Sequence, residues 1–167
     1  MAALSRFISK LGEKALPFYQ RMKKADKFEW AAEAEAAFID LKRILTTPPI
    51  LVAPKERQAL YLYVSTTNRV VSTTLVVEHM EEGHAQIIQR LVYYLNEVLS
   101  ISKWRYPHYE KLAYVVFMSS KKLTHYFAEH LITVISNSAI SDILTNPNAT
   151  GRVAKWLIKV GIKGHQV

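Results

Sequence analysis

Hydrophobic and polar residues alternate through several short stretches of the chain, and this period-two pattern predicts β-strands. In the clearest stretch, ALYLYVS, leucine and valine at the even positions alternate with more polar residues at the odd positions. A turn centred on Gly83 separates the second stretch from the third and is typical of a β-hairpin. The predicted strands are residues 59–65, 70–79, 85–95 and 131–136.

A longer stretch, Arg105 to His130, has helical periodicity instead. Tyr106-Pro107 is a helix-start signal, because proline in a first turn lacks only an N–H that would be unpaired there. Apolar and small residues then recur at steps of three and four. They form one face, which we expect to pack on the sheet. The residues on this face are Leu112, Val116, Ser119, Leu123 and Phe127.

Further helices are predicted before the first strand and after the last. Gly12 is expected to end the first helix, Pro17 lies near the start of the second, and Pro48-Pro49 ends the third. An apolar stripe along the third helix predicts that one side of it is buried. These helices are residues 2–11, 15–24, 30–46, 139–145 and 152–160.

The order of the elements indicates an α/β (α+β) fold, with a mixed sheet of about four strands covered by helices and preceded by a small helical segment. Residues 50–58 are extended and rich in turn residues. We therefore expect a boundary near residue 55, with a helical segment at 1–55 and a second domain at 56–167.

The amino-acid composition limits the class of protein and the cellular compartment. Of the 167 residues 50% are hydrophobic, so the chain can form a core. No apolar run approaches the ~20 residues of a membrane span, so we expect no membrane partner. The absence of cysteine excludes disulfides and a cysteine nucleophile and fits a reducing compartment, cytoplasmic or nuclear. The basic, amphipathic start of the chain leaves mitochondrial targeting as a less favoured alternative.

The histidines do not predict a metal site. His125 and His130 are five residues apart, which is not a spacing that shares one helix face. His79 and His84 flank the hairpin turn, but no third ligand accompanies them. No GxSxG motif occurs, so the serines give no indication of a hydrolase triad or of a small-molecule substrate.

Longer phrases of the sequence resemble the end of a gypsy-type long-terminal-repeat retrotransposon polyprotein, most closely that of plant elements. Residues 2–55 resemble the tail of the reverse-transcriptase thumb, through FISKLGEKALPFYQRMKK, FEW…AEAAFIDLK and LTTPPIL. Residues 57–167 resemble a ribonuclease H domain, through LYLYVS, VVSTTLVVE, YYLNEVLS, RYPHYEKLAYVV, KKLTHYF and TVISNS. TGRVAKWLIK resembles plant lineages that carry a second, degenerate ribonuclease H-like domain.

The resemblance implies a chemistry whose residues are missing. Ribonuclease H uses acidic side chains to hold two divalent cations, about 3.5–4 Å apart. In active relatives these acids lie in phrases such as LYTDAS, EKEL and TVRTDHK. Ser65, Leu112 and Asn137 occupy the corresponding positions here. Glu110 is two residues from Leu112, which is about 200° around a helix, so it is expected to face away. A fourth acid would follow a fifth strand that the chain does not reach, so the domain is interpreted as degenerate and truncated.

Net charge is +8, spread along the chain, and it allows binding to phosphates. By the resemblance, basic residues around the main helix would lie near a nucleic-acid hybrid. A solvated helix face explains the same residues equally well. The candidate nucleic-acid-binding residues are Lys103, Arg105, Lys111, Lys121 and Lys122.

We therefore expect a non-catalytic, retrotransposon-derived module that acts by protein contact, like a connection or tether. No metal and no cofactor is expected, and no YxDD polymerase motif occurs. Uncovered sheet edge and apolar surface would favour another protein or a second copy as partner, and we expect a dimer or a hetero-complex. The start at Met1 suggests a separate reading frame that a host has adopted. The alternative is a non-catalytic protein that binds nucleic acid or an RNA–DNA hybrid. An active nuclease is disfavoured.

Overall fold

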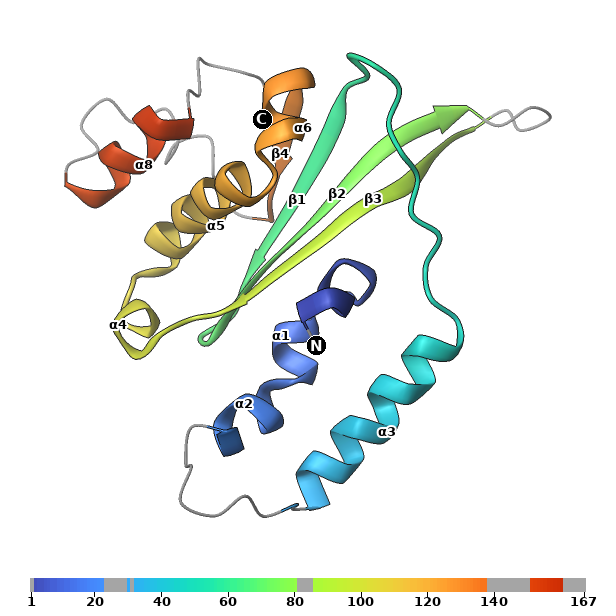
Figure 1. Ribbon diagram of the computed structural model, residues 1–167. Helices are drawn as coiled ribbons and strands as arrows, with labels where there is room; N and C mark the ends of the chain where they lie inside the picture. The colour runs from blue at the N-terminus through green and yellow to red at the C-terminus, as the bar shows by residue number, and fades with distance from the viewer. Residues whose placement is uncertain (1, 23–29, 31, 81–85, 138–150, 161–167) are drawn as a thin grey trace.

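A mixed four-stranded sheet forms the centre of the fold, as the sequence predicts. The computed structural model describes residues 2–22, 30, 32–80, 86–137 and 151–160. The strand order is β3-β2-β1-β4, with β1 antiparallel to β2, β2 antiparallel to β3, and β1 parallel to β4 (Figure 1). The strands are β1 (Leu60–Thr66), β2 (Val70–Met80), β3 (Ile87–Val98) and β4 (Ile132–Ile135).

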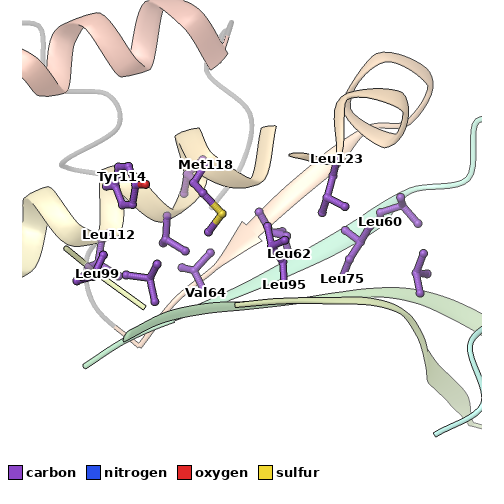
Figure 2. Packing of buried hydrophobic residues seen from close by; sticks show 14 of the residues in the cluster. Leu60, Leu62, Val64, Leu75, Leu95, Leu99, Leu112, Tyr114, Met118 and Leu123 are labelled. Atoms are coloured by element: carbon purple, nitrogen blue, oxygen red, sulfur yellow. The ribbon is translucent and has the colours of Figure 1, made fainter. Parts of the chain in front are cut away.

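One face of the sheet carries the main core. Alternate side chains of β1 point to this face, because successive residues of a strand project to opposite sides. Leu60 and Leu62 are fully buried there, and Leu112 and Val115 of helix α5 (His108–Lys122) pack onto them. Figure 2 shows this layer of leucines, valines and Met118 between α5 and the strands.

The predicted helix over residues 105–130 was wrong in its continuity. The structure divides it into α5 and α6 (Thr124–Glu129), and a separate short helix, α4 (Ile101–Trp104), precedes them. Leu123, between α5 and α6, has φ −111° and ψ 36°, outside helical geometry. Near it, Ser120 Oγ donates to the carbonyl of Phe117 at 2.8 Å and Thr124 Oγ1 donates to that of Lys121 at 2.9 Å. Such side-chain bonds compete with the helix ladder and explain the break. Pro107 is the residue that precedes α5 rather than part of its first turn.

The predicted apolar face of this helix is confirmed across the break. Leu112, Val116 and Ser119 are buried on α5 and Leu123 is buried just beyond it, while Phe127 of α6 packs partly buried against the same cluster. The side chain of Ser119 is accommodated because its Oγ donates to the carbonyl of Val115 at 2.7 Å.

The other face of the sheet is partly covered by the N-terminal residues. Asn96 projects from β3 to this face, and its Nδ2 donates to the carbonyl of Ile8 at 3.3 Å. Gly12 packs directly on Val70 of β2. The prediction that Gly12 ends the first helix was therefore wrong. Instead there is a 3-10 helix η1 (Ala2–Phe7), and Gly12 lies inside α1 (Leu11–Lys14), where a larger residue would clash with the sheet.

The remaining N-terminal helices form a second, smaller cluster. Helix α3 (Ala32–Thr46) packs Leu41 against Ile8, Leu11 and Ala15. From there the chain returns to the sheet, and the N–H of Val52 donates to the carbonyl of Leu91 on β3 at 2.8 Å. The helices of this cluster are α1, α2 (Leu16–Met22) and α3 (Ala32–Thr46).

A last helix packs beside α5. Helix α8 (Arg152–Val160) matches the predicted residues 152–160, and Trp156 stacks on Phe117 with ring centroids 6.0 Å apart. The helix predicted at 139–145 and the turn at Gly83 lie outside the described residues. No helix among the described residues is both long and apolar enough to cross a bilayer.

Substitution of Gly12 tests the packing of α1 on the sheet. A Cβ at Gly12 would lie 2.7 Å from Cγ1 of Val70, so we expect Gly12→Ala to lower the free energy of unfolding by roughly 1–3 kcal/mol. Urea titration followed by circular dichroism measures the loss. In the double variant with Val70→Ala, the loss should be smaller than the sum of the two single losses by about 1 kcal/mol. Additive losses would mean that the two residues do not clash.

Candidate functional site

The residues singled out by the catalytic resemblance do not share one site. Leu112 is 2% exposed and lies in the apolar core under α5. Ser65 is exposed and projects to the opposite face of β1, because it alternates with Val64, which packs in that core. The predicted catalytic positions therefore place one side chain in the core and one on the far side of the sheet.

Asn137 lies near Ser65 in the register of the sheet. The last paired residues of the parallel strands are Tyr63 and Ile135, and Ser65 and Asn137 each follow by two residues. Asn137 is exposed, just beyond the end of β4. Parallel strands bring their carboxyl ends to one edge, so the backbone supports the spacing that the resemblance implies for these two positions.

The side chains present do not fit a pair of divalent cations. Such cations need several hard oxygen ligands, and carboxylates supply them best. A hydroxyl, a buried leucine and an amide provide neither the charge nor the convergence. Among the described residues no group of three histidine, aspartate or glutamate side chains could hold a metal ion. No step of a metal-dependent hydrolysis can be built on these residues.

Glu110 faces away from Leu112, as expected. Its Oε2 accepts a hydrogen bond from Arg152 of α8 at 3.2 Å. Arg152 also lies over the ring of Tyr106, 4.4 Å from its centroid, and Trp156 contacts both Tyr106 and Tyr114. The one acid of the catalytic phrase therefore anchors α8 to α5 rather than lining a cleft.

A polar hollow of about 270 Å³ lies at the carboxyl end of β1, beside the N-terminus of α5. Lys111 projects into it and is only 6% exposed, and its Nζ donates to the carbonyl of Asn68 at 3.2 Å. No carboxylate of the described residues pairs with Lys111. Thr66 Oγ1 and His108 Nδ1 lie 3.3 Å apart at its rim. The hollow is lined by Thr66, Thr67, Asn68, Trp104, Tyr106, His108 and Lys111.

Sequence reasoning found Lys111 but missed the rest of this hollow. Thr66 and His108 are 42 residues apart, and no local motif links them. The alternation of β1 was the available signal, because it places Thr66 rather than Ser65 on the side of α5.

The other candidate nucleic-acid-binding residues differ in their partners. Lys103 and Lys122 both contact Glu97 of β3, with Nζ to carboxylate distances of 2.8 and 3.5 Å. Arg105 and Lys121 are exposed and have no side-chain partner among the described residues. Arg105 precedes α5 and Lys121 lies in its last turn, so the length of the helix separates them.

Glu97 is the centre of a half-buried polar cluster that ties β3 to α4 and α5. Lys103 and Tyr114 both donate to Glu97, and Lys103 also donates to the hydroxyl of Tyr114. Burial by itself would raise the pKa of Glu97. The hydrogen bonds from Lys103 and Tyr114 and the charges of Lys103 and Lys122 outweigh it, so the pKa lies below its ordinary value of 4.5.

The same contacts also shift the pKa values of Lys103 and Tyr114. Burial would lower the pKa of Lys103, but its bonds to Glu97 and Tyr114 raise it above its ordinary value. Burial and then the bond to Glu97 raise the pKa of the Tyr114 hydroxyl. At neutral pH both partners are therefore in the protonation states that hold the cluster together.

The cluster predicts a pH dependence of stability. Because the folded-state pKa of Glu97 is lowered, its contribution is complete above the unfolded value near 4.5 and is lost as pH falls through the folded value. We expect Glu97→Gln to lower the free energy of unfolding by about 1–2 kcal/mol at pH 7 and by much less near pH 3. Glu56→Gln is the matched control, because that side chain is 90% exposed. An equal loss for Glu97→Gln at both pH values would contradict the assignment.

Comparison with known proteins agrees with the fold. The sequence model of the RNase H-like domain found in reverse transcriptase matches residues 30–134, more than half of the chain. The match begins before α3 and ends in β4, so it includes α5, three strands and most of the fourth. Comparison with curated proteins gives no match.

Solved structures of the foamy virus protease–reverse transcriptase have the same fold. One, designated dRH and in complex with double-stranded DNA, matches with a TM-score of 0.73 and 14% identity over 95% of this chain and 28% of that one. Another, in complex with an RNA/DNA hybrid, gives a TM-score of 0.67 and 15% identity over 96% of this chain and 22% of that one. This chain thus spans less than a third of the foamy virus chains, and at such identity the likeness concerns the fold alone.

The strand order, the helix on the sheet and the sequence match agree with one another. The chain belongs to the family of RNase H-like domains found in reverse transcriptases.

Proposed function

We propose that the chain is a non-catalytic RNase H-like module that acts by contact with protein, as a connection or tether does. The observation that carries the proposal is the position of Leu112, which is 2% exposed in the main core where the resemblance expects a catalytic acid. Ser65 and Asn137 supply only neutral side chains. A site without carboxylates cannot gather two divalent cations for hydrolysis.

Exposed apolar side chains support contact as the mode of action. They lie on α3, in the segment that follows it, at the far end of the β2–β3 hairpin, beside β4 and on α8, and each could enter a partner's surface. Among the described residues β4 is also one of the two outer strands of the sheet, and such an edge has unpaired backbone groups. The exposed side chains with more than half of their surface accessible include Ile39, Ile50, Met80, Ile87, Leu131 and Ile158.

The alternative is a non-catalytic protein that binds nucleic acid. Lys111 favours it, because a nearly buried ammonium without a carboxylate partner among the described residues is suited to an anion. The foamy virus relatives bind double-stranded DNA or an RNA/DNA hybrid. Against it, Lys103 and Lys122 are already paired with Glu97, so fewer cations remain for phosphates.

The type of retrotransposon from which the chain derives is also part of this proposal. Phrases such as RYPHYEKLAYVV and TGRVAKWLIK favour a gypsy-type element of the plant lineages as the source. Adoption by a host, the division at residue 55 and a cytoplasmic or nuclear location stay predictions. The contacts of Gly12 and Asn96 show that η1 and α1 nevertheless pack on the sheet.

Binding and cleavage of a labelled RNA–DNA hybrid test the proposal directly. With Mg²⁺ present we expect no cleavage, and we expect no binding that weakens steeply as salt rises, because phosphate contacts release counterions. Fluorescence anisotropy at low and near-physiological salt measures binding, and a denaturing gel of the same samples measures cleavage.

Lys111 separates the two candidate functions. Salt-sensitive binding that Lys111→Met weakens roughly tenfold, with Lys121→Met as the exposed control, would favour the nucleic-acid alternative. Binding unaffected by either variant would count against the hollow as its site. Cleavage by the wild type, abolished by EDTA, would overturn both candidates.

Substitution at Leu112 tests whether the catalytic position tolerates a carboxylate. We expect Leu112→Glu to lower the free energy of unfolding by about 3–5 kcal/mol at pH 7, because the new charge would be buried without a partner. The loss should shrink at low pH as the new carboxyl is protonated. Leu112→Met should cost less than about 1.5 kcal/mol. A Leu112→Glu protein as stable as the wild type at pH 7 would show that the position opens to solvent.

A further inference from the structure

Helix α3 has an outward side that nothing in the described structure covers. Ala34 and Leu41, at 2% and 8% exposed, mark its inward side. With 3.6 residues per turn, the opposite side is centred on Ile39, which is 57% exposed and lies midway along the helix. Figure 1 shows α3 at the periphery, away from the sheet. We call this side the outward stripe; its residues, all exposed, are Ala32, Glu35, Ala36, Ile39, Lys42, Arg43 and Thr46.

Charge is arranged symmetrically about Ile39 with opposite signs. Glu35 lies four residues before it and Arg43 four residues after it. The stripe is therefore acidic in its first half and basic in its second half. A surface of this kind is complementary to itself when one copy is reversed.

We propose that two copies of this chain pair through the outward stripe of α3, antiparallel, with the two-fold axis at Ile39. The pairing places Glu35 of one copy opposite Arg43 of the other, on both sides of the axis. The two Ile39 side chains meet at the centre, and Ala32 and Ala36 leave room for the helices to approach. A parallel pairing would instead oppose like charges, so the antiparallel one is selected.

The contacts that Glu35 and Arg43 make within one copy are compatible with this pairing of two copies. Arg43 contacts Asp40 at 2.9 Å, but their side chains are 80% and 40% exposed, and exposed pairs of this kind contribute little. Glu35 accepts a hydrogen bond from the indole of Trp30, which is itself 48% exposed. Trp30 packs edge-on against Phe38 with ring centroids 5.7 Å apart, and this pair forms an apolar border beside the stripe.

The proposal rests on the proposed function and names the partner and the surface. A single helix of 15 residues is about 22 Å long, and two such helices bury less than the ~1,200 Å² of a stable interface. The dimer is therefore reversible, with a dissociation constant on the order of 100 µM.

Charge reversal tests the pairing. Sedimentation velocity of the full chain from about 5 to 500 µM should show a monomer–dimer equilibrium. Glu35→Arg opposes two like charges on each side of the axis, and so does Arg43→Glu. Each should raise the dissociation constant at least tenfold. An equimolar mixture of the two variants should restore association, because each new charge then faces its opposite. Glu33→Arg, on the same helix but off the stripe, is the matched control and should dimerise like the wild type.

The outcomes decide the proposal. Restored association in the mixture, with both single variants folded by circular dichroism, supports the pairing. A wild type that stays monomeric at the highest concentration overturns it, as does either single variant dimerising like the wild type. Neither result bears on hybrid cleavage or salt-sensitive binding, so a failure of this pairing is distinguishable from a failure of the proposed function.

Discussion

The contact between α5 and the central strand β1 is the constraint on which the rest of the structure depends. Leu60 and Leu62 are excluded from solvent by α5, and Leu112 and Val115 meet them from the helix. Full burial of one such side chain is worth about 1.5–3 kcal/mol, so the layer as a whole outweighs any single polar contact near it. Because Leu112 belongs to this layer, the position that the resemblance links to catalysis serves packing here. The same contact fixes where both ends of α5 lie, and with them the hollow at Lys111 and the cluster at Glu97.

Polar groups around this core serve mainly to hold elements together. Glu97 brings Lys103 and Lys122 to β3, Glu110 brings Arg152 and α8 to α5, and Asn96 brings the N-terminal segment to the far face of the sheet. Two of the candidate binding residues, Lys103 and Lys122, are therefore already engaged by a carboxylate. Lys111 is the exception, because it is buried without a carboxylate partner among the described residues. That contrast is why the hollow, rather than the charge of the chain, carries the nucleic-acid alternative.

The sheet also separates two kinds of surface. On one face α5 and α6 close the main core, and α8 packs against α5 on the side away from the strands (Figure 1). On the other face η1 and α1 pack at one end, and α3 contacts the other N-terminal helices through the small cluster around Leu41. A helix held by so small a contact leaves most of its circumference outside. The outward side of α3 and the edge of β4 are therefore parts of the described structure that other elements leave uncovered.

The sequence by itself determined the elements and the faces they bury. Alternation located β1 and put Ser65 on the face opposite Val64, and the three- and four-residue steps identified the face of α5 that includes Leu112. These patterns follow from local geometry, which repeats every two or 3.6 residues. The tertiary structure decided which residues far apart in the sequence come into contact, because local patterns carry no information on such pairs. Gly12 is needed because Val70, far along the chain, approaches it, and Lys111 and Thr66 share a hollow only because β1 and α5 are packed together. The break at Leu123 depends on the hydrogen bonds that the hydroxyls of Ser120 and Thr124 donate to backbone carbonyls of the preceding turn. Contacts between distant residues are set by packing, so only the folded chain shows them.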